Sequence, residues 1–329
     1  MAKARSLEAK LAKLRGLRGA PRSPELMAEL RAALTVASNF VVAEAAEIVG
    51  EQKLSELIPD LLAAFERFLV EPEKTDKQCR AKIAIAEALN QLEYNEEAFF
   101  WKGARYVQFE PVWGGEKDTA APLRVTCAFS LVRNHAPGVL PYLVDLLNDP
   151  EKPARIGAAQ ALAYSETESA ALLLRLKARI GDADPEVIAE CFNGLLGLET
   201  SQAVPLVAEF LDSHELAIQE AAILALGDSR RPEAFDALKA FWERHIDNRL
   251  QETILMAISL LRLPLATDFL LSLVAKEVDA IARTAVAALA IHRYDARLRE
   301  KTAAAVAQSG RAALKAFFED RFRVRETSD

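Results

Sequence analysis

A short apolar pattern recurs along this chain at nearly regular intervals. One copy begins at Arg155, continues three and four positions later with Ala158-Ala159, and closes with Ala161-Leu162 after one spacer. The copies begin at positions 42, 82, 124, 155, 188, 219, 253 and 282, and the last five intervals are nearly equal. Apolar side chains three and four positions apart share one face of an α-helix. The interval is long enough for two short helices and two turns, so the pattern predicts a stack of helical hairpins.

Proline positions support the same division independently. Pro59, Pro141 and Pro205 each lie at the same distance after the start of their copy, at 42, 124 and 188, and just ahead of an apolar run. Proline is favoured in the first turn of a helix, where its missing N–H would be unpaired anyway. We therefore expect the second helix of each hairpin to begin at a fixed point, and the first helix to begin in the same way at Pro122, Pro153 and Pro185.

The pattern resembles HEAT repeats, in particular the short bacterial HEAT-like repeats of the phycobilisome-lyase type, over roughly residues 38–296. The resemblance implies an all-α fold, a right-handed α-solenoid of about eight HEAT-like helical hairpins. It also implies a concave surface formed by the second helices. It implies no catalytic residue, because the HEAT pattern is structural.

We expect three parts: a basic N-terminal arm or capping helix at 1–22, the solenoid at 23–296, and C-terminal capping helices at 297–329. The arm carries seven basic residues against one acid, Glu8, and its leucines have helical spacing. It could dock on the first repeat, stay mobile, or contact nucleic acid or an anionic membrane surface. The closing helices, followed by Arg321, Arg323 and Arg325, would shield the last apolar face of the stack.

An irregular insertion interrupts the stack at 95–121, between the copies that begin at 82 and 124. It concentrates aromatic residues in a chain with only 7% of them, and Trp113-Gly114-Gly115 has the composition of a turn. Two interpretations stay open. The aromatic residues could wedge between repeats, or they could form a surface that binds a partner.

If the insertion is a binding surface, we expect three aromatic anchors and two cations that pair with an anionic group of the partner. The anchors would be Trp101, Tyr106 and Trp113, and the cations Arg105 and Arg124, with Glu110 and Asp118 beside them. Asp118-Thr119 is also well placed to cap the helix that begins near Pro122.

The composition narrows the class of function. The net charge of −7 disfavours non-specific nucleic-acid binding. Cys79, Cys127 and Cys191 are far apart and fall on small-residue helix faces, so we expect small buried hydrophobes and not a disulfide or metal site. No two of the four histidines share a helical turn, and no phosphate-binding or nucleophile motif occurs. We expect no metal, no cofactor and no enzymatic activity.

The sequence thus favours an interaction scaffold or adaptor that binds a protein or peptide through its groove and the aromatic insertion. One alternative is a nucleic-acid-binding protein similar to the HEAT-like alkylpurine DNA glycosylases. Another is a chaperone or lyase for a prosthetic group. Neither a signal peptide nor an apolar stretch long enough to span a membrane stands out, so we expect a cytoplasmic protein, with a monomer favoured.

Overall fold

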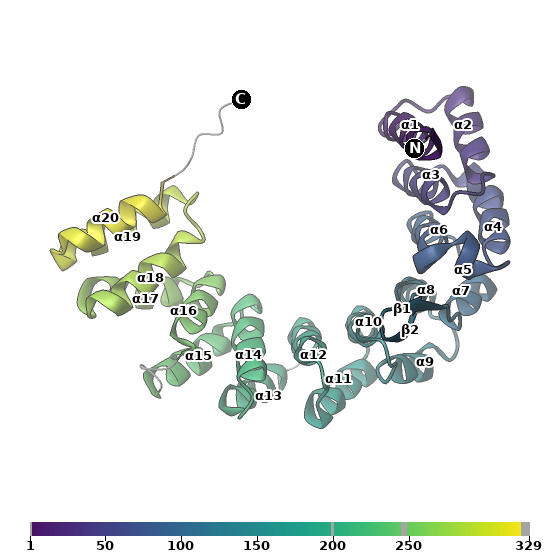
Figure 1. Cartoon of the computed structure of the whole chain (residues 1–329). Coiled ribbons are helices and arrows are strands. Elements are labelled where there is room, and N and C mark those ends of the chain that lie inside the picture. The colour runs from purple at the N-terminus through teal and green to yellow at the C-terminus, as the bar shows by residue number, and fades with distance from the viewer. Residues whose placement is uncertain (1, 199–200, 245–248, 324–329) are drawn as a thin grey trace. The chain divides into compact units, whose positions relative to one another are not determined.

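The computed structural model describes residues 2–198, 201–244 and 249–323 (Figure 1). One of the four histidines, His245, and Arg325 of the predicted C-terminal segment lie outside these ranges. The chain divides into two compact units, Met1–Ala170 and Ala171–Asp329, and each is a stack of helical hairpins. The all-α solenoid fold is confirmed, with one exception of two short strands described below.

The first unit holds two layers of helices. The first helices of the hairpins, α3, α6, α8 and α10, pack against one another in succession, and the second helices α4, α7 and α9 pack beside them. The helices are α1 (Ala2–Arg15), α2 (Pro24–Leu34), α3 (Asn39–Glu51), α4 (Ile58–Arg67), α5 (Pro72–Thr75), α6 (Arg80–Gln91), α7 (Glu97–Ala104), α8 (Ala121–Arg133), α9 (Val139–Leu146) and α10 (Lys152–Tyr164), with two short 3₁₀ turns at Ser55–Leu57 and Lys77–Cys79.

The second unit continues the alternation, and α11 (Glu168–Ile180) begins at the boundary between the units. Its first helices α12, α14, α16 and α18 again pack in succession. The helices are α12 (Pro185–Gly197), α13 (Ala203–Glu209), α14 (Leu216–Asp228), α15 (Pro232–Arg244), α16 (Gln251–Leu260), α17 (Pro264–Lys276), α18 (Asp279–Ala290), α19 (Ala296–Ser309) and α20 (Ala312–Arg321), with a 3₁₀ turn at Phe210–Asp212.

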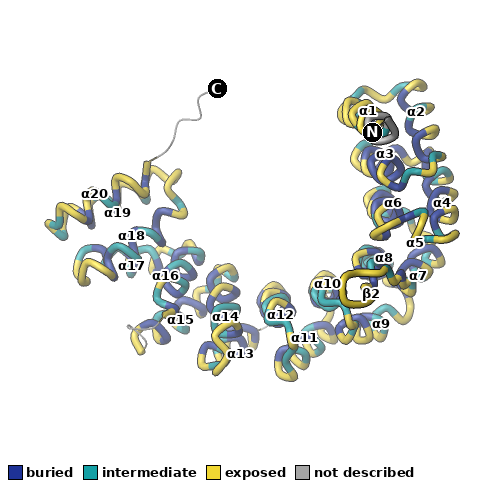
Figure 2. Tube along the Cα trace, viewed as in Figure 1, coloured by how far each residue is buried: buried dark blue, intermediate teal, exposed yellow. Residues whose placement is uncertain are grey.

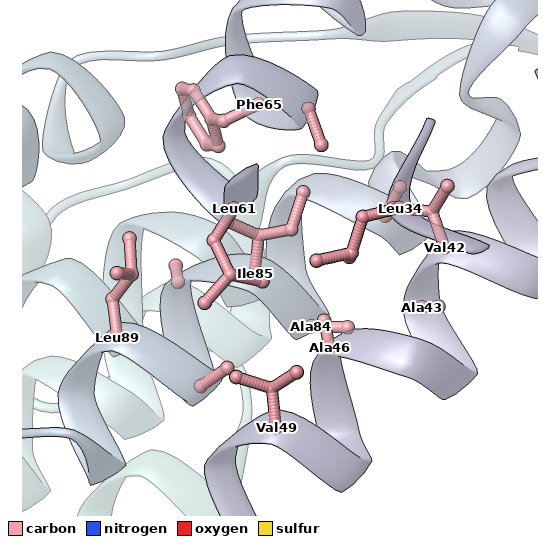
Figure 3. Packing of buried hydrophobic residues seen from close by; sticks show 14 of the residues in the cluster. Leu34, Val42, Ala43, Ala46, Val49, Leu61, Phe65, Ala84, Ile85 and Leu89 are labelled. Carbon is pink, nitrogen blue, oxygen red and sulfur yellow. The ribbon is translucent and has the colours of Figure 1, made fainter. Parts of the chain in front are cut away.

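The repeated apolar positions form the core between these layers. In the first unit, Val42 and Val49 of α3 and Ile85 of α6 belong to one cluster (Figure 3), and all three are fully buried. Leu61 and Phe65 of α4 close the same cluster from the second layer. Each hairpin therefore buries its apolar face only against its neighbours, which is how a solenoid is stabilised without a single central core.

Small residues bring the first helices especially close together. A Cβ atom added at Gly50 of α3 would lie 3.0 Å from Ala88 Cα of α6. Figure 1 shows α3, α6, α8 and α10 on the inner side of the bend within the first unit, and the second helices on the outer side. The expectation that second helices form the concave surface is therefore wrong in this unit, because the small residues of the first helices let that layer pack more tightly.

A left-handed residue ends the first helix of most hairpins. In five copies it lies eleven positions after the start: Lys53, Glu93, His135, Glu166 and Arg230, with φ between 51° and 56°. Such a residue reverses the chain at a helix C-terminus and lets the following amide reach back, as Leu54 N does to Val49 O at 3.0 Å.

The left-handed residue of the seventh copy shows that this copy starts earlier than predicted. Arg262 has φ 56°, which places the start at Gln251, two positions before the predicted start at 253. Ile254-Leu255 and Ala257-Ile258 then occupy the paired apolar positions, and all four are fully buried. The interval from 219 to 251 then nearly equals the interval from 251 to 282, so the spacing is closer to constant than predicted.

A polar residue six positions before the start organises the turn between hairpins. Asp118, Asp149 and Asp182 each accept a hydrogen bond from the backbone amide two positions ahead, at 2.9 Å in every case. Ser213 does the same for Glu215 N at 3.2 Å. These side chains replace backbone partners that the turn cannot supply. These four copies therefore share an Asp or Ser at the turn in addition to their apolar positions.

Helices α1 and α20, near the two ends of the described residues, each dock on the stack. Helix α1 packs against α3, Leu14 is buried there, and Arg18 forms ion pairs with Glu44, Glu47 and Glu51. At the other end, α20 packs on α18 and α19, where Leu314 and Phe322 are fully buried. The terminal segments thus cover apolar surface of the outermost repeats in the part of the chain that the structure describes.

Candidate binding site: the hairpin between α7 and α8

The insertion contains an antiparallel β-hairpin in place of the expected irregular loop. Strand β1 (Phe109–Val112) pairs with β2 (Gly115–Asp118), in the register Phe109 with Asp118 and Val112 with Gly115. Trp113 and Gly114 form the two-residue turn, and Gly114 has φ 94°, a conformation that glycine adopts without strain. The predicted turn is confirmed, whereas the two strands were not predicted.

The apolar side chains of this hairpin face solvent. Phe109 is 55% exposed, Val112 47% and Trp113 103%, so the indole ring at the tip touches almost nothing. Figure 2 shows the hairpin as an exposed loop beside the label β2. In the described part of the chain, no other tryptophan is exposed, because Trp101 is half-buried and Trp242 is 3% exposed.

The base of the hairpin is fixed by a buried carboxylate. Asp118 is 6% exposed and accepts hydrogen bonds from Gln108 N at 3.0 Å and from Ala120 N at 2.9 Å. Thr119 adds a backbone hydrogen bond to Gln108 O at 2.8 Å. The predicted capping role of Asp118-Thr119 is wrong, because the N-cap of α8 is Ala120 and no side chain caps this helix; Asp118 instead bonds the amide of Ala120 in the turn before it.

Arg124 of α8 completes this framework. Its Nη1 lies 2.5 Å from Asp118 Oδ2 and 3.1 Å from Tyr106 O, and its Nη2 lies 2.9 Å from Asp149 Oδ2. Burial alone would lower the pKa of the guanidinium, but the hydrogen bond and charge of Asp118 and the charge of Asp149 outweigh it and raise the pKa. Arg124 therefore links the turn before α8 to the turn between α9 and α10, and its charge is already neutralised by the carboxylates of Asp118 and Asp149.

Glu110 ties the hairpin to the segment before α6. Its Oε1 accepts hydrogen bonds from Gln78 N at 2.6 Å, Gln108 Nε2 at 2.7 Å and Thr119 Oγ1 at 2.8 Å. The backbone at Gln78 and Cys79 is left-handed, with φ 62° and 53°. Holding two consecutive non-glycine residues in this region costs energy. The hydrogen bonds that Glu110 accepts from Gln78 N and Asp76 from Ala81 N and Lys82 N help to offset this cost.

Beneath the hairpin lies a second buried ion pair. Lys82 and Asp76 are both fully buried, with Nζ 2.8 Å from Oδ2, and Nζ also donates to Phe68 O at 3.1 Å. The Lys82 ammonium lies 5.2 Å from the centroid of the Tyr106 ring. Lys82 and Asp76 hold the same repeat positions as Arg124 and Asp118. That equivalence was present in the sequence but was not used to predict this pair.

The other predicted site residues, Trp101, Tyr106 and Arg105, differ in how far they are buried. Trp101 packs edge-on against Tyr142 of α9 at 5.5 Å between centroids, and the exposed Arg105 covers its ring at 5.0 Å. Tyr106 is half-buried, its hydroxyl lies 3.2 Å from Gln108 Oε1, and burial raises the pKa of its phenol. Phe99 and Phe100 are buried against Phe65 and each other.

The two interpretations of the insertion, packing between repeats and a surface open to a partner, thus each describe part of it. Helix α7 packs on α8, and Phe99 and Trp101 add ring contacts to α4 and α9, whereas the hairpin carries Phe109 and Trp113 outward. Arg124 and Asp118 belong to the repeat framework, and Arg105 lies on Trp101. Phe109 and Val112 were not among the predicted site residues; their position beside the Trp-Gly turn was the signal for them.

Three further findings concern metal binding, membrane spanning and the cysteines. Among the residues that the structure describes, no three His, Cys, Asp or Glu side chains are grouped so that they could hold a metal ion. No helix in the same residues is both long enough and apolar enough to span a bilayer. All three cysteines are buried and free.

Comparison with known proteins agrees with the repeat assignment. Residues 171–259, which span α11 to most of α16, match the family model described as HEAT repeats. With the stacked hairpins of both units, this match defines the chain as a HEAT-repeat α-solenoid, as its repeat pattern predicted. No curated protein sequence matches the chain.

Several solved structures are similar to the chain at low identity. Human deoxyhypusine hydroxylase in complex with glycerol is 21% identical with a TM-score of 0.30, over 78% of this chain and 90% of that one. The complex of CpcE and CpcF of phycocyanin lyase from Nostoc sp. PCC7120 is 17% identical with a TM-score of 0.33, over 88% and 94%. An engineered protein is 16% identical with a TM-score of 0.36, over 96% and 94%. No function follows from likenesses of this size.

Proposed function

We propose that this protein is a non-enzymatic binding protein that holds a partner protein through the tip of the β1–β2 hairpin. HEAT repeats commonly mediate protein binding, and the hairpin adds a projecting apolar feature to them. The single observation that carries the proposal is the fully exposed indole of Trp113 on a hairpin whose base is rigidly fixed.

Leaving this ring in water is costly to the free protein. A tryptophan side chain offers roughly 150–250 Å² of contact area. At about 25 cal/mol per Å², its burial in a partner would contribute roughly 4–6 kcal/mol before the costs of association. Tryptophan is also enriched among the few residues that dominate binding energy.

The fixed base lowers the cost of binding. Asp118, Glu110 and Gln108 already order the hairpin through hydrogen bonds to backbone and side chains. A partner therefore need not order this segment, and less of the gross interaction energy is lost on association.

The hairpin alone is smaller than a stable interface, which buries about 800 Å² on each side. The surroundings can supply the rest. Val107 is 48% exposed, and Lys117 and Glu116 flank the tip as charged rim residues. We therefore expect a folded partner with an apolar hollow for the indole, surrounded by polar groups.

A photo-crosslinking experiment tests the proposal. A benzophenone amino acid replaces Trp113 in one protein and the 65% exposed Val70 of the same unit in a control. Cell extract from the source organism is then irradiated with each. The expected result is a discrete adduct from position 113 only, suppressed by excess wild-type protein but not by excess Trp113→Ser protein. Adducts that are equal at both positions, or that both competitors suppress equally, would overturn the assignment.

A further inference from the structure

A second surface feature lies in the second unit, far along the chain from the hairpin. A hollow of about 380 Å³ opens between the turn joining α16 to α17 and the turn joining α18 to α19. Three cationic side chains line it, Arg262, Arg297 and Lys301, against a single carboxylate, Asp295. The hollow is therefore strongly basic in a chain whose net charge is −7.

The three cationic side chains are not paired within the protein. Among the described residues, the side chains of Arg262, Arg297 and Lys301 find no hydrogen-bond or ion-pair partner. The carboxylate of Asp295 accepts from the amides of Arg297 and Leu298 at 3.0 and 3.1 Å, so it caps α19. The positive charge of the hollow thus remains largely uncompensated.

A buried hydroxyl in the same hollow also lacks a partner. Ser259 is 6% exposed, lines the hollow, and its Oγ makes no hydrogen bond. Its carbonyl lies 3.0 Å from Nε2 of His292, another lining residue. An unpaired buried hydroxyl costs free energy unless a ligand or solvent pairs with it, so this side chain points to an occupant that accepts hydrogen bonds.

The equivalent hollow of the first unit shows the contrast. It lies between the α8–α9 and α10–α11 turns and is lined by Arg133, but that guanidinium donates to Asn90 O at 2.7 Å and to Tyr94 O at 3.2 Å. A hollow between successive turns is thus a property of the stack, whereas the α16–α19 hollow differs from this one in its three unpaired cations and its unpaired hydroxyl.

We infer that the α16–α19 hollow binds a phosphate group, either free phosphate or a small phosphate ester. Three cations against one carboxylate leave an excess of about two positive charges, which matches a phosphate dianion. Arginine binds phosphate oxygens through paired N–H groups, lysine contributes a compact charge, and the Ser259 hydroxyl supplies a neutral donor. The donors are side chains, because Asp295 already occupies the first amides of α19.

Calorimetric titration with inorganic phosphate tests this site, with sodium chloride at equal ionic strength as the blank. Arg297→Gln and Lys301→Gln are expected to weaken phosphate binding about tenfold each, since each removes a charge-assisted contact. Lys315→Gln removes the same charge from an exposed, unpaired lysine of α20 and is expected to leave the affinity unchanged. Equal weakening by Lys315→Gln, or no weakening by the two pocket variants, would overturn the site.

Ser259→Ala separates binding from folding. Because its hydroxyl has no protein partner, the variant should keep the melting temperature of the wild type while its phosphate affinity falls severalfold. An unchanged affinity would show that the hydroxyl faces no ligand. A parallel titration with glycerol phosphate identifies the source: tighter binding than inorganic phosphate indicates an ester, and equal or weaker binding indicates free phosphate. No binding of either overturns the inference.

Discussion

Arg124 and Asp118 form a buried ion pair, 2.5 Å between Nη1 and Oδ2, at the point where β2 leads into α8. Both side chains are 6% exposed. A pair in this setting orients the hairpin relative to the repeats, because neither group can turn toward water without leaving the other buried and charged.

Removing the arginine is expected to destabilise the protein strongly. Arg124→Met leaves Asp118 and Asp149 without their shared cation, and loss of one partner of a buried pair costs about 3–5 kcal/mol. Lys102→Met breaks the exposed pair with Glu66 and should cost less than about 1 kcal/mol. Urea unfolding of the two variants measures the difference, and equal losses would show that the Arg124 pair is no more than a surface contact.

The second prediction concerns the close approach of α14 and α16 at Gly227. A Cβ at Gly227 of α14 would lie 2.6 Å from the backbone Cα and O of Ala257 in α16. Since backbone cannot move aside easily, Gly227→Ala should destabilise by about 1–3 kcal/mol.

Gly197 of α12 is the matched control, because a Cβ there meets nothing within 4 Å. Gly197→Ala should stabilise by up to about 1 kcal/mol through helix propensity. If both alanines stabilise in thermal unfolding, α14 and α16 are not packed as closely as described.

The left-handed turn residues offer a stabilising change. Glu93 has φ 56°, is exposed and lies in the turn from α6 to α7, where the Tyr94 amide reaches back to Leu89 O at 3.0 Å. Glycine adopts this conformation without the steric penalty, so Glu93→Gly should stabilise by about 0.5–1 kcal/mol. Gln160→Gly, at an exposed position inside α10, should instead cost about 1 kcal/mol. Destabilisation by both would contradict the left-handed turn.

The cysteines should be unreactive in the folded protein. Burial raises the pKa of the Cys79 and Cys191 thiols to about 12. A thiol reagent at pH 8 should therefore label none of the three until urea unfolds the chain. Labelling at the rate of a free peptide thiol would contradict the burial.

The raised pKa values of these thiols also make the stability of the fold depend on pH. In the unfolded chain these thiols ionise near pH 8.5, so they release protons that the folded protein retains. Stability should fall as pH rises above about 8.5 toward 12, and Cys191→Ala should reduce this slope. A stability that stays flat over this range would contradict the raised pKa values.

The repeats could be predicted from sequence because their apolar pattern is periodic. Each further copy with the same spacing is independent support for the helical hairpin. The error of two positions at the seventh copy arose because Met256-Ala257 and Ile254-Leu255 both satisfy an apolar pair. Only the backbone at Arg262 distinguishes them. Strands β1 and β2 were missed because such short strands, with Pro111 and several charged residues, show no apolar alternation.

The site was less predictable than the fold. Sequence placed Arg124 and Trp113 in the same cluster, yet one is buried between two aspartates and the other is in solvent. Burial depends on the neighbours that the hairpin brings together, and short-range sequence does not contain that information. The framework role of Arg124 could have been inferred from Asp118 six positions before it, since Lys82 and Asp76 repeat the same spacing.

The central claim is that Trp113 becomes buried when a partner binds. Trp101→Phe with Trp242→Phe leaves Trp113 as the only tryptophan, since the chain has three. In the free protein its emission should be water-like and fully quenched by iodide, as its exposure requires. Addition of the cross-linked partner, purified, should shift the emission to shorter wavelength and remove most of the quenching. Saturating binding of the partner with unchanged Trp113 quenching would contradict the account.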